Sequence, residues 1–120
     1  MITFYGLKNC DTCSKARKWL TLGNINFEFF DLREKPLSRK IITKWLEVHP
    51  LEKVVNKRST TWRNLNEELR NKLEINAIEI MIEFPSLVKR PFWEIKGIPN
   101  KVLEPGFGSR HQDFIKNQLV

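Results

Sequence analysis

Residues 1–20 have the sequence MITFYGLKNCDTCSKARKWL, which predicts a strand followed directly by an amphipathic helix. The apolar run at residues 1–5 has the composition of a buried strand, and the helix is expected to begin near Thr12. Cys10 and Cys13 lie at the junction of the two elements. They are the only cysteines in the chain, so any disulfide within one chain must join them.

The position of Cys10 favours the thiolate form of its sulfur. The first turn of a helix leaves backbone N–H groups without intrahelical partners and carries the positive end of the helix dipole. Both effects stabilise a thiolate, and Lys8 adds positive charge nearby, whereas Asp11 opposes it. We therefore expect Cys10 to be the attacking sulfur. Cys13, one turn further along the helix, is placed to resolve a mixed disulfide formed on Cys10.

Two other interpretations of the cysteine pair are a zinc half-site and a pair of inert buried thiols. A structural zinc ion usually takes four Cys or His ligands, but the chain has no second CxxC, and His49 and His111 stand alone and far apart. No metal is therefore expected. A CxxC between a strand and a helix is typical of a redox motif, which favours a catalytic pair over inert thiols.

The segments nearest the two ends predict strands and helices in alternation. A second strand is predicted at residues 26–31, and Gly23 is expected to end the preceding helix in a left-handed conformation. The first thirty residues thus form a βαβ unit. Later in the chain, residues 92–95 and 101–103 are predicted to be extended and separated by a turn, and residues 109–119 are predicted to form a closing helix.

The middle of the chain is predicted to be mostly helical. Ser38 is expected to cap a helix that Pro50 ends. Another helix is expected to open at Thr61 or its neighbour and to run through Leu65, Leu69 and Leu73. Asn76 is expected to cap a third, which ends before Pro85. The pattern therefore predicts helices between two halves of an α/β domain.

This order of elements, βαβ, then helices, then ββα, predicts an α/β fold with a thioredoxin/glutaredoxin-like core. The core would contain a mixed four-stranded sheet. We expect one domain over residues 1–120, with the core at residues 1–37 and 85–120 and a helical insertion at residues 38–84.

Composition limits the function classes. The 120 residues include 21 Lys and Arg against 14 Asp and Glu, a net charge of +7, but the basic residues are spread along the chain and interleaved with acidic ones. That pattern is typical of solvated helix faces, so nucleic-acid binding is disfavoured and an anionic small molecule or protein surface is preferred. No apolar run reaches membrane-spanning length and no secretory signal pattern is present. We expect a cytoplasmic monomer.

Four segments resemble the arsenate reductase (ArsC)/Spx family, most closely its YffB-like branch. The resemblance spans nearly the whole chain and keeps the order of the family's motifs. The segments are YGLKNCDTCSKARKWL at residues 5–20, NKRSTTWR at residues 56–63, VKRP at residues 88–91, and Gly106-Phe107.

The resemblance implies a thioredoxin-like core and a reactive thiolate at Cys10 surrounded by basic residues. Arg58 and Arg90 match positions where arsenate reductases hold an oxyanion, and Pro91 resembles the family's cis-proline. Independently, the planar fork of a guanidinium suits a thiolate, a tetrahedral oxyanion or a glutathione carboxylate. The alternative for each arginine is a solvent-facing charge or a structural ion pair.

The residues expected to contact substrate are the neighbours of the cysteines and the proline turn. They are Lys8, Asn9, Thr12 and Pro91. Two departures from arsenate reductases bear on the substrate. The third oxyanion-binding arginine is missing from residues 100–106, where Glu104 would repel arsenate. In addition, Cys13 provides a local resolving thiol of the kind found in Spx-type regulators.

Three hypotheses follow. The first is a thiol-dependent oxidoreductase in which Cys10 attacks a disulfide or other electrophile and Cys13 or glutathione resolves the product. Its partners would be glutathione or another thiol reductant and a small anionic or disulfide substrate, with no tightly bound cofactor. The second is an arsenate reductase proper. The third is an Spx-like regulator that binds RNA polymerase and uses the CxxC as a redox switch.

Overall fold

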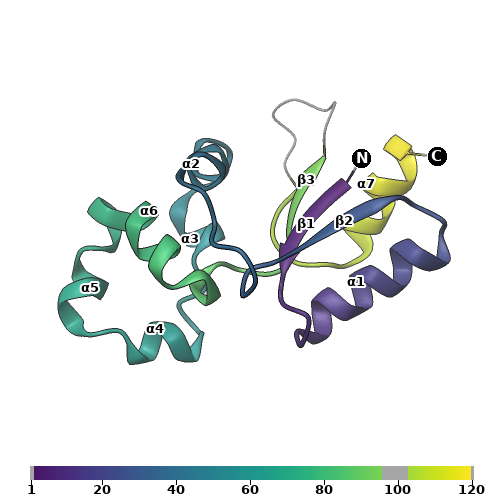
Figure 1. Ribbon diagram of the computed structural model, residues 1–120. Coiled ribbons are helices and arrows are strands. Elements are labelled where there is room, and N and C mark those ends of the chain that lie inside the picture. Colours follow the sequence, from purple (N-terminus) through teal and green to yellow (C-terminus); the bar gives the residue numbers. More distant parts are fainter. Residues whose placement is uncertain (1, 96–102, 120) are drawn as a thin grey trace. The chain divides into compact units, whose positions relative to one another are not determined.

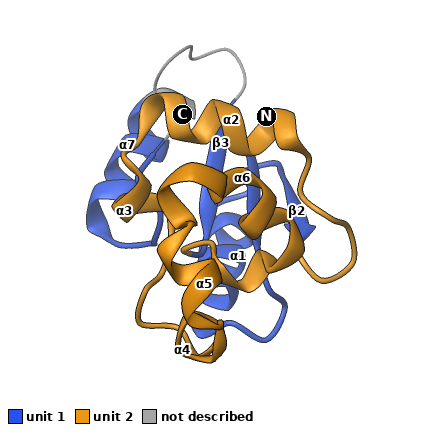
Figure 2. Ribbon diagram, turned by 90° about the vertical axis from the view of Figure 1, so that its left-hand side faces the viewer, with its two compact units in different colours: residues 1–31, 90–120 blue, residues 32–89 orange. Residues whose placement is uncertain are grey.

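A computed structural model describes residues 2–95 and 103–119 of the chain. The residues divide into two compact units, one formed by residues 1–31 with 90–120 and the other by residues 32–89 (Figure 2). The first unit is therefore assembled from two distant parts of the sequence.

The sheet of the first unit has strand order β2-β1-β3 (Figure 1). The central strand β1 (Ile2–Gly6) runs parallel to β2 (Phe27–Asp31) and antiparallel to β3 (Phe92–Ile95). These are three of the four predicted strands, and the described residues form no further strand in this sheet. The predicted fourth strand lies almost wholly outside the described residues, as does the turn before it. Leu103, its last residue, is described and is not in a strand.

Helices α1 (Asp11–Leu22) and α7 (Ser109–Leu119) share one hydrophobic core with the sheet. The strands contribute side chains that alternate along β1 and β3, because residues two apart in a strand face the same side. This core explains why the predicted helices form, since burial of an amphipathic face supplies most of a short helix's stability. Its fully or nearly fully buried members are Ile2, Phe4, Ala16, Leu20, Trp93, Ile95 and Ile115.

The end of α1 differs from the prediction for Gly23. Gly23 has φ −84°, and its N–H donates to Trp19 O at 3.1 Å, so it is not left-handed. The following residue, Asn24, takes the left-handed conformation instead, with φ 56°. Asparagine tolerates this region better than most residues, so the turn does not require the glycine there.

The second unit is helical. Ser38 caps α2 (Arg39–Val48) as predicted, because its Oγ accepts a hydrogen bond from the Ile41 N–H at 3.1 Å. The stretch after Pro50 contains more and shorter helices than predicted. It contains α3 (Leu51–Val54), α4 (Thr60–Asn64), α5 (Glu67–Asn71), α6 (Leu73–Glu83) and the short 3₁₀ helix η1 (Pro85–Leu87).

Asn76, predicted to cap a helix, is not the N-cap of α6, which is Lys72, but a second helical stretch does begin at Asn76. Asn76 lies inside α6, where its φ of −118° and ψ of 33° mark a kink between two helical stretches. The predicted insertion at residues 38–84 falls within the second unit, whose bounds are residues 32–89. A single domain over the whole chain stays a prediction. Among the described residues, no helix is both long and apolar enough to cross a bilayer.

Candidate functional site

The chain places Cys10 at the N-terminus of α1. After β1 ends at Gly6, a short loop turns back so that the Cys10 N–H donates to Leu7 O at 3.2 Å. Cys10 is the N-cap, with extended φ and ψ of −92° and 123°, and its carbonyl accepts the Ser14 N–H at 2.9 Å. The half-buried Cys10 side chain therefore stands beside the unpaired N–H groups of the first helical turn.

Cys13 is fully buried one turn into α1. Its sulfur packs directly against the backbone of Gly6, so closely that a Cβ added to Gly6 would collide with Sγ. Gly6 has no left-handed φ that would demand glycine, so the requirement is one of space alone. The end of β1 and the first turn of α1 are in contact through this one sulfur.

The pairing of β1 with β3 places the Arg90-Pro91 turn near the cysteine loop. Tyr5 pairs with Phe92 in the β1–β3 register, which brings Pro91 beside the end of β1. The Arg90–Pro91 peptide bond is cis, as the resemblance to the family implies. The Gly106 N–H donates to Pro91 O at 2.9 Å, and Trp93 Nε1 donates to Gly106 O at 2.7 Å. These two hydrogen bonds join the proline turn to Gly106, which has a left-handed φ of 115°.

The pKa of the Cys10 thiol is lowered. Burial alone would raise it, but the Cys13 backbone N–H, the Cys13 thiol and the positive charge of Arg90 all favour the thiolate and outweigh burial. Arg90 acts both as a nearby charge and as a hydrogen-bond donor. The helix terminus predicted from the sequence and the Arg90 guanidinium therefore act in the same direction.

The pKa of the Cys13 thiol is raised to about 12. Burial is the largest cause, and the neighbouring Cys10 adds to it, while the Leu7 backbone N–H and Arg90 act the other way. The pair thus combines one thiol whose pKa is lowered with one that stays protonated at neutral pH. Both cysteines are free thiols in the structure.

The other predicted site residues are distributed as follows. Lys8 and Asn9 are exposed in the loop before Cys10, and Thr12 is half-buried in the first turn of α1. Arg58 lies in the second unit, exposed, with its backbone N–H donating to Asn56 Oδ1 at 3.0 Å. The first unit brings together the two cysteines, Arg90 and Pro91, whereas the proximity of Arg58 to them stays a prediction.

Two residues of this site, Gly6 and Arg17, were not among those predicted from the sequence. Arg17 Nη2 donates to Lys8 O at 3.3 Å, and the Arg17 guanidinium carbon lies 4.8 Å from the centroid of the Phe29 ring. The spacing of four residues between Cys13 and Arg17 was a usable signal, because it predicts neighbours on a helix. For Gly6 the signal was a glycine at the end of a strand that leads into the cysteine loop.

Gly6→Ala should destabilise the protein by about 1–3 kcal/mol, because the new methyl group and Cys13 Sγ cannot occupy the same space. Gly108→Ala is the matched control, since a Cβ at Gly108 meets nothing within 4 Å. Urea unfolding measures both. If the sulfur is the cause, Gly6→Ala should cost much less in a Cys13→Ala background. An equal cost in both backgrounds would show that another contact is responsible.

Labelling with iodoacetamide should separate the two thiols by pH. Cys10, with its lowered pKa, should react at neutral pH, and its rate should fall as the pH drops through that pKa. Cys13 should stay unlabelled until strongly alkaline pH, because its pKa is about 12. Peptide mass spectrometry of the native protein reads out each site, and the urea-unfolded protein, in which both thiols should titrate together, is the control. Faster labelling of Cys13 in the native protein would refute the assignment.

Comparisons with known proteins match this geometry to one family. The model of the ArsC family matches residues 5–97, most of the chain. An uncharacterized protein of Haemophilus influenzae is 46% identical over 92 residues, which cover 76% of this chain and 81% of the relative. The global transcriptional regulator Spx of Lactiplantibacillus plantarum is 33% identical over 94 residues, which cover 76% of this chain and 70% of the regulator.

Solved structures agree with the fold. A YFFB protein superposes with a TM-score of 0.84 and 34% identity over the full length of both chains. An arsenate reductase (ArsC) related protein of Brucella melitensis superposes with a TM-score of 0.69 and 33% identity, covering 96% of this chain and 94% of that one. The α/β unit that carries Cys10 and Pro91 has a thioredoxin-like arrangement. By its motifs, its matched residues and its fold, the chain belongs to the ArsC family.

Proposed function

We propose that the protein is a thiol-dependent oxidoreductase that uses Cys10 as its nucleophile and Cys13 as its resolving thiol. The observation that supports this most is the asymmetry of the pair. The pKa of Cys10 is lowered, the pKa of the buried Cys13 is raised to about 12, and a hydrogen bond links the two side chains. An attacking sulfur must be ionised and accessible, whereas a resolving sulfur must be close and protected until it is needed.

The proposed cycle has three balanced steps. The Cys10 thiolate attacks one sulfur of a disulfide, forms a mixed disulfide and releases the other sulfur as a thiolate. Cys13 then loses its proton to that leaving thiolate or to solvent and attacks Cys10, which releases the second half of the substrate and closes the Cys10–Cys13 disulfide. Finally two glutathione molecules, or one external dithiol, reduce the disulfide and become oxidised themselves. No bound cofactor is needed.

Arg90 stabilises the thiolate in this proposal, and Arg58 binds an anionic part of the substrate. In the same proposal, Lys8, Asn9, Thr12 and Pro91 contact the substrate. We place the reaction in the cytoplasm, where a CxxC is kept reduced.

Two other functions have support of their own. The similarity to an ArsC-related structure favours arsenate reduction, but the missing arginine at residues 100–106 and the carboxylate of Glu104 weaken oxyanion binding. The similarity to Spx favours a regulator in which the same cysteines switch binding to RNA polymerase. A regulator would form the Cys10–Cys13 disulfide without multiple turnovers, so turnover separates it from an enzyme.

The proposed cycle predicts multiple turnovers of a model disulfide with glutathione, measured through NADPH consumption by glutathione reductase. Cys10→Ser should abolish activity, since no other ionised sulfur is available. Cys13→Ser should accumulate a mixed disulfide on Cys10, which intact mass detects. Stoichiometric oxidation without turnover would instead support the regulator, and turnover of arsenate alone would support the reductase.

Replacing Arg90 or Arg58 by alanine should change the reaction rates of Cys10 in different ways. Arg90→Ala should slow Cys10 toward charged and neutral disulfides alike, because it removes a charge that holds the pKa of Cys10 down. Arg58→Ala should slow only the anionic reagent, by about ten- to hundred-fold, the value of a charge-assisted hydrogen bond of about 1.5–3 kcal/mol. Lysine should restore each activity only in part, because it lacks the planar fork.

Arg110→Ala is the control for these rates, because Arg110 is an exposed residue of α7 in the same unit as Cys10. Its rates should match the wild type with both reagents. Unchanged rates in Arg58→Ala would remove Arg58 from the site, and unchanged rates in Arg90→Ala would contradict the electrostatic role given to it.

A further inference from the structure

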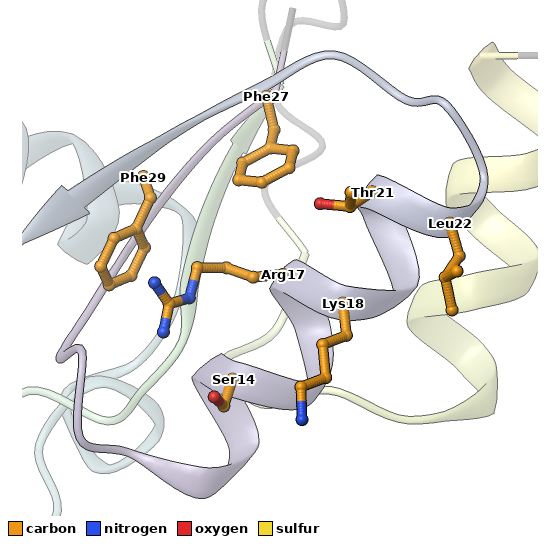
Figure 3. A pocket seen from close by; sticks show the side chains of 7 residues that line it. All are labelled: Ser14, Arg17, Lys18, Thr21, Leu22, Phe27 and Phe29. Atoms are coloured by element: carbon orange, nitrogen blue, oxygen red, sulfur yellow. The ribbon is translucent and has the colours of Figure 1, made fainter.

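A groove between α1 and β2 lies next to the cysteine loop and has no role in the cycle above. It encloses about 730 Å³, within the range of small-molecule sites (Figure 3). Phe27 and Phe29 of β2 give the groove an apolar side, and Leu22 of α1 adds a further apolar side chain. The Leu22 side chain is unusual for a leucine in that it is 85% exposed. A site of this size and lining fits a small molecule with an apolar body.

The other side of the groove is positively charged. Arg17 and Lys18 line it together with the hydroxyl-bearing residues Ser14 and Thr21, and no carboxylate belongs to the lining. Figure 3 shows the Arg17 guanidinium directed across the groove toward the Phe29 ring. A ligand with one negative charge would therefore meet two cations and no opposing acid.

Arg17 has hydrogen-bonding capacity to spare. Its Nε is buried without a hydrogen-bond partner among the described residues, and the hydrogen bond from its Nη2 to Lys8 O is long at 3.3 Å. The Arg17 guanidinium lines the groove and carries five N–H donors, so it can bind an acceptor placed there. A carboxylate is the acceptor that fits a guanidinium best.

The groove is aligned with the reactive sulfur along α1. Cys10, Ser14, Arg17 and Thr21 follow the spacing of one helix face, and Cys10 is joined to Ser14 by the first hydrogen bond of the helix. Seven residues of helix separate the Cα atoms of Cys10 and Arg17 by about 10 Å along the axis. Because the Arg17 side chain reaches back to the loop that carries Cys10, the span from sulfur to guanidinium is shorter.

We propose that this groove binds the anionic, apolar half of the disulfide that Cys10 attacks. The ligand class is a small thiol or disulfide with a carboxylate on an aromatic or branched apolar body. Its carboxylate would lie on Arg17 and Lys18 and its body against Phe27 and Leu22. The inference rests on the proposed function, since Cys10 bonds to one sulfur of this disulfide and the other leaves as a thiolate.

Binding is tested without chemistry in Cys10→Ser. The probes are 1-naphthoate and the neutral 1-naphthamide, which share one ring system, and the readout is the shift of backbone amide signals in NMR titrations. Naphthoate should bind about ten-fold or more tightly than naphthamide and shift the amides of α1 and β2. Arg17→Gln should remove most of this preference. Lys18→Gln should reduce the preference for naphthoate less than Arg17→Gln does. Because Lys18 is exposed, this substitution should leave the fold intact, so its effect is not due to misfolding. Arg110→Gln is the control and should change nothing.

The link to Cys10 is tested by its reaction rate in the wild-type background. The reagents are the anionic 5,5′-dithiobis(2-nitrobenzoate) and the neutral 4,4′-dithiodipyridine. Arg17→Gln and Lys18→Gln should slow the anionic reagent several-fold and leave the neutral one unchanged. Equal binding of the two naphthyl probes, or amide shifts away from α1 and β2, would overturn the site. Binding with unchanged rate ratios would overturn its substrate role. Absence of glutathione-dependent turnover in the wild type would instead contradict the proposed function and leave the binding result standing.

Discussion

The contact between Cys13 Sγ and the backbone of Gly6 is the constraint on which the site depends. It joins the last residue of the central strand to the first turn of α1 with no side chain between them. Cys13 is fully buried at this close approach, and burial is the largest cause of its raised pKa. The central position of β1 then matters, because β3 pairs with the same strand and delivers Arg90 and Pro91 to its end.

Cys10 and Cys13 have the same side chain, so the difference between their pKa values follows from their positions. Cys10 stands at the helix terminus beside donors and the Arg90 charge, and Cys13 lies three residues further on, where burial dominates. Each sulfur also changes the pKa of the other in a consistent direction, because the proton that Cys13 keeps is available to stabilise the thiolate of Cys10. Removing either sulfur therefore alters the one that remains.

The sequence predicts the local features of this protein well and the contacts between distant segments poorly. The strand at β1, the helix at α1 and the asymmetry of the cysteines depend on a few neighbouring residues, so pattern and helix geometry were sufficient. The four-residue spacing of Leu65, Leu69 and Leu73 predicted one helix, yet Asn66 ends that continuity by accepting the Leu69 N–H at 2.8 Å and starting α5. Local capping thus outweighed apolar periodicity there.

Among the candidate site residues, those fixed by the chain near Cys10 were predictable and those fixed by packing were not. The collision that reserves Gly6 for glycine depends on where α1 settles against β1, and the partners of Arg17 include Phe29 on a separate strand. No pattern within one segment reports such contacts. The family motif at Arg90-Pro91 did point to the site, because it carries information about a fold that brings distant residues together.

The first unit is built from residues 1–31 and 90–120, and this split has a consequence during protein synthesis. A ribosome completes α1 and both cysteines well before it reaches Arg90 and β3. Until the β1–β3 pairing forms, Cys10 lacks the charge of Arg90, so only the neighbouring Cys13 of α1 lowers its pKa. The order of translation thus delays the last contribution to the activation of Cys10 until β3 joins the sheet.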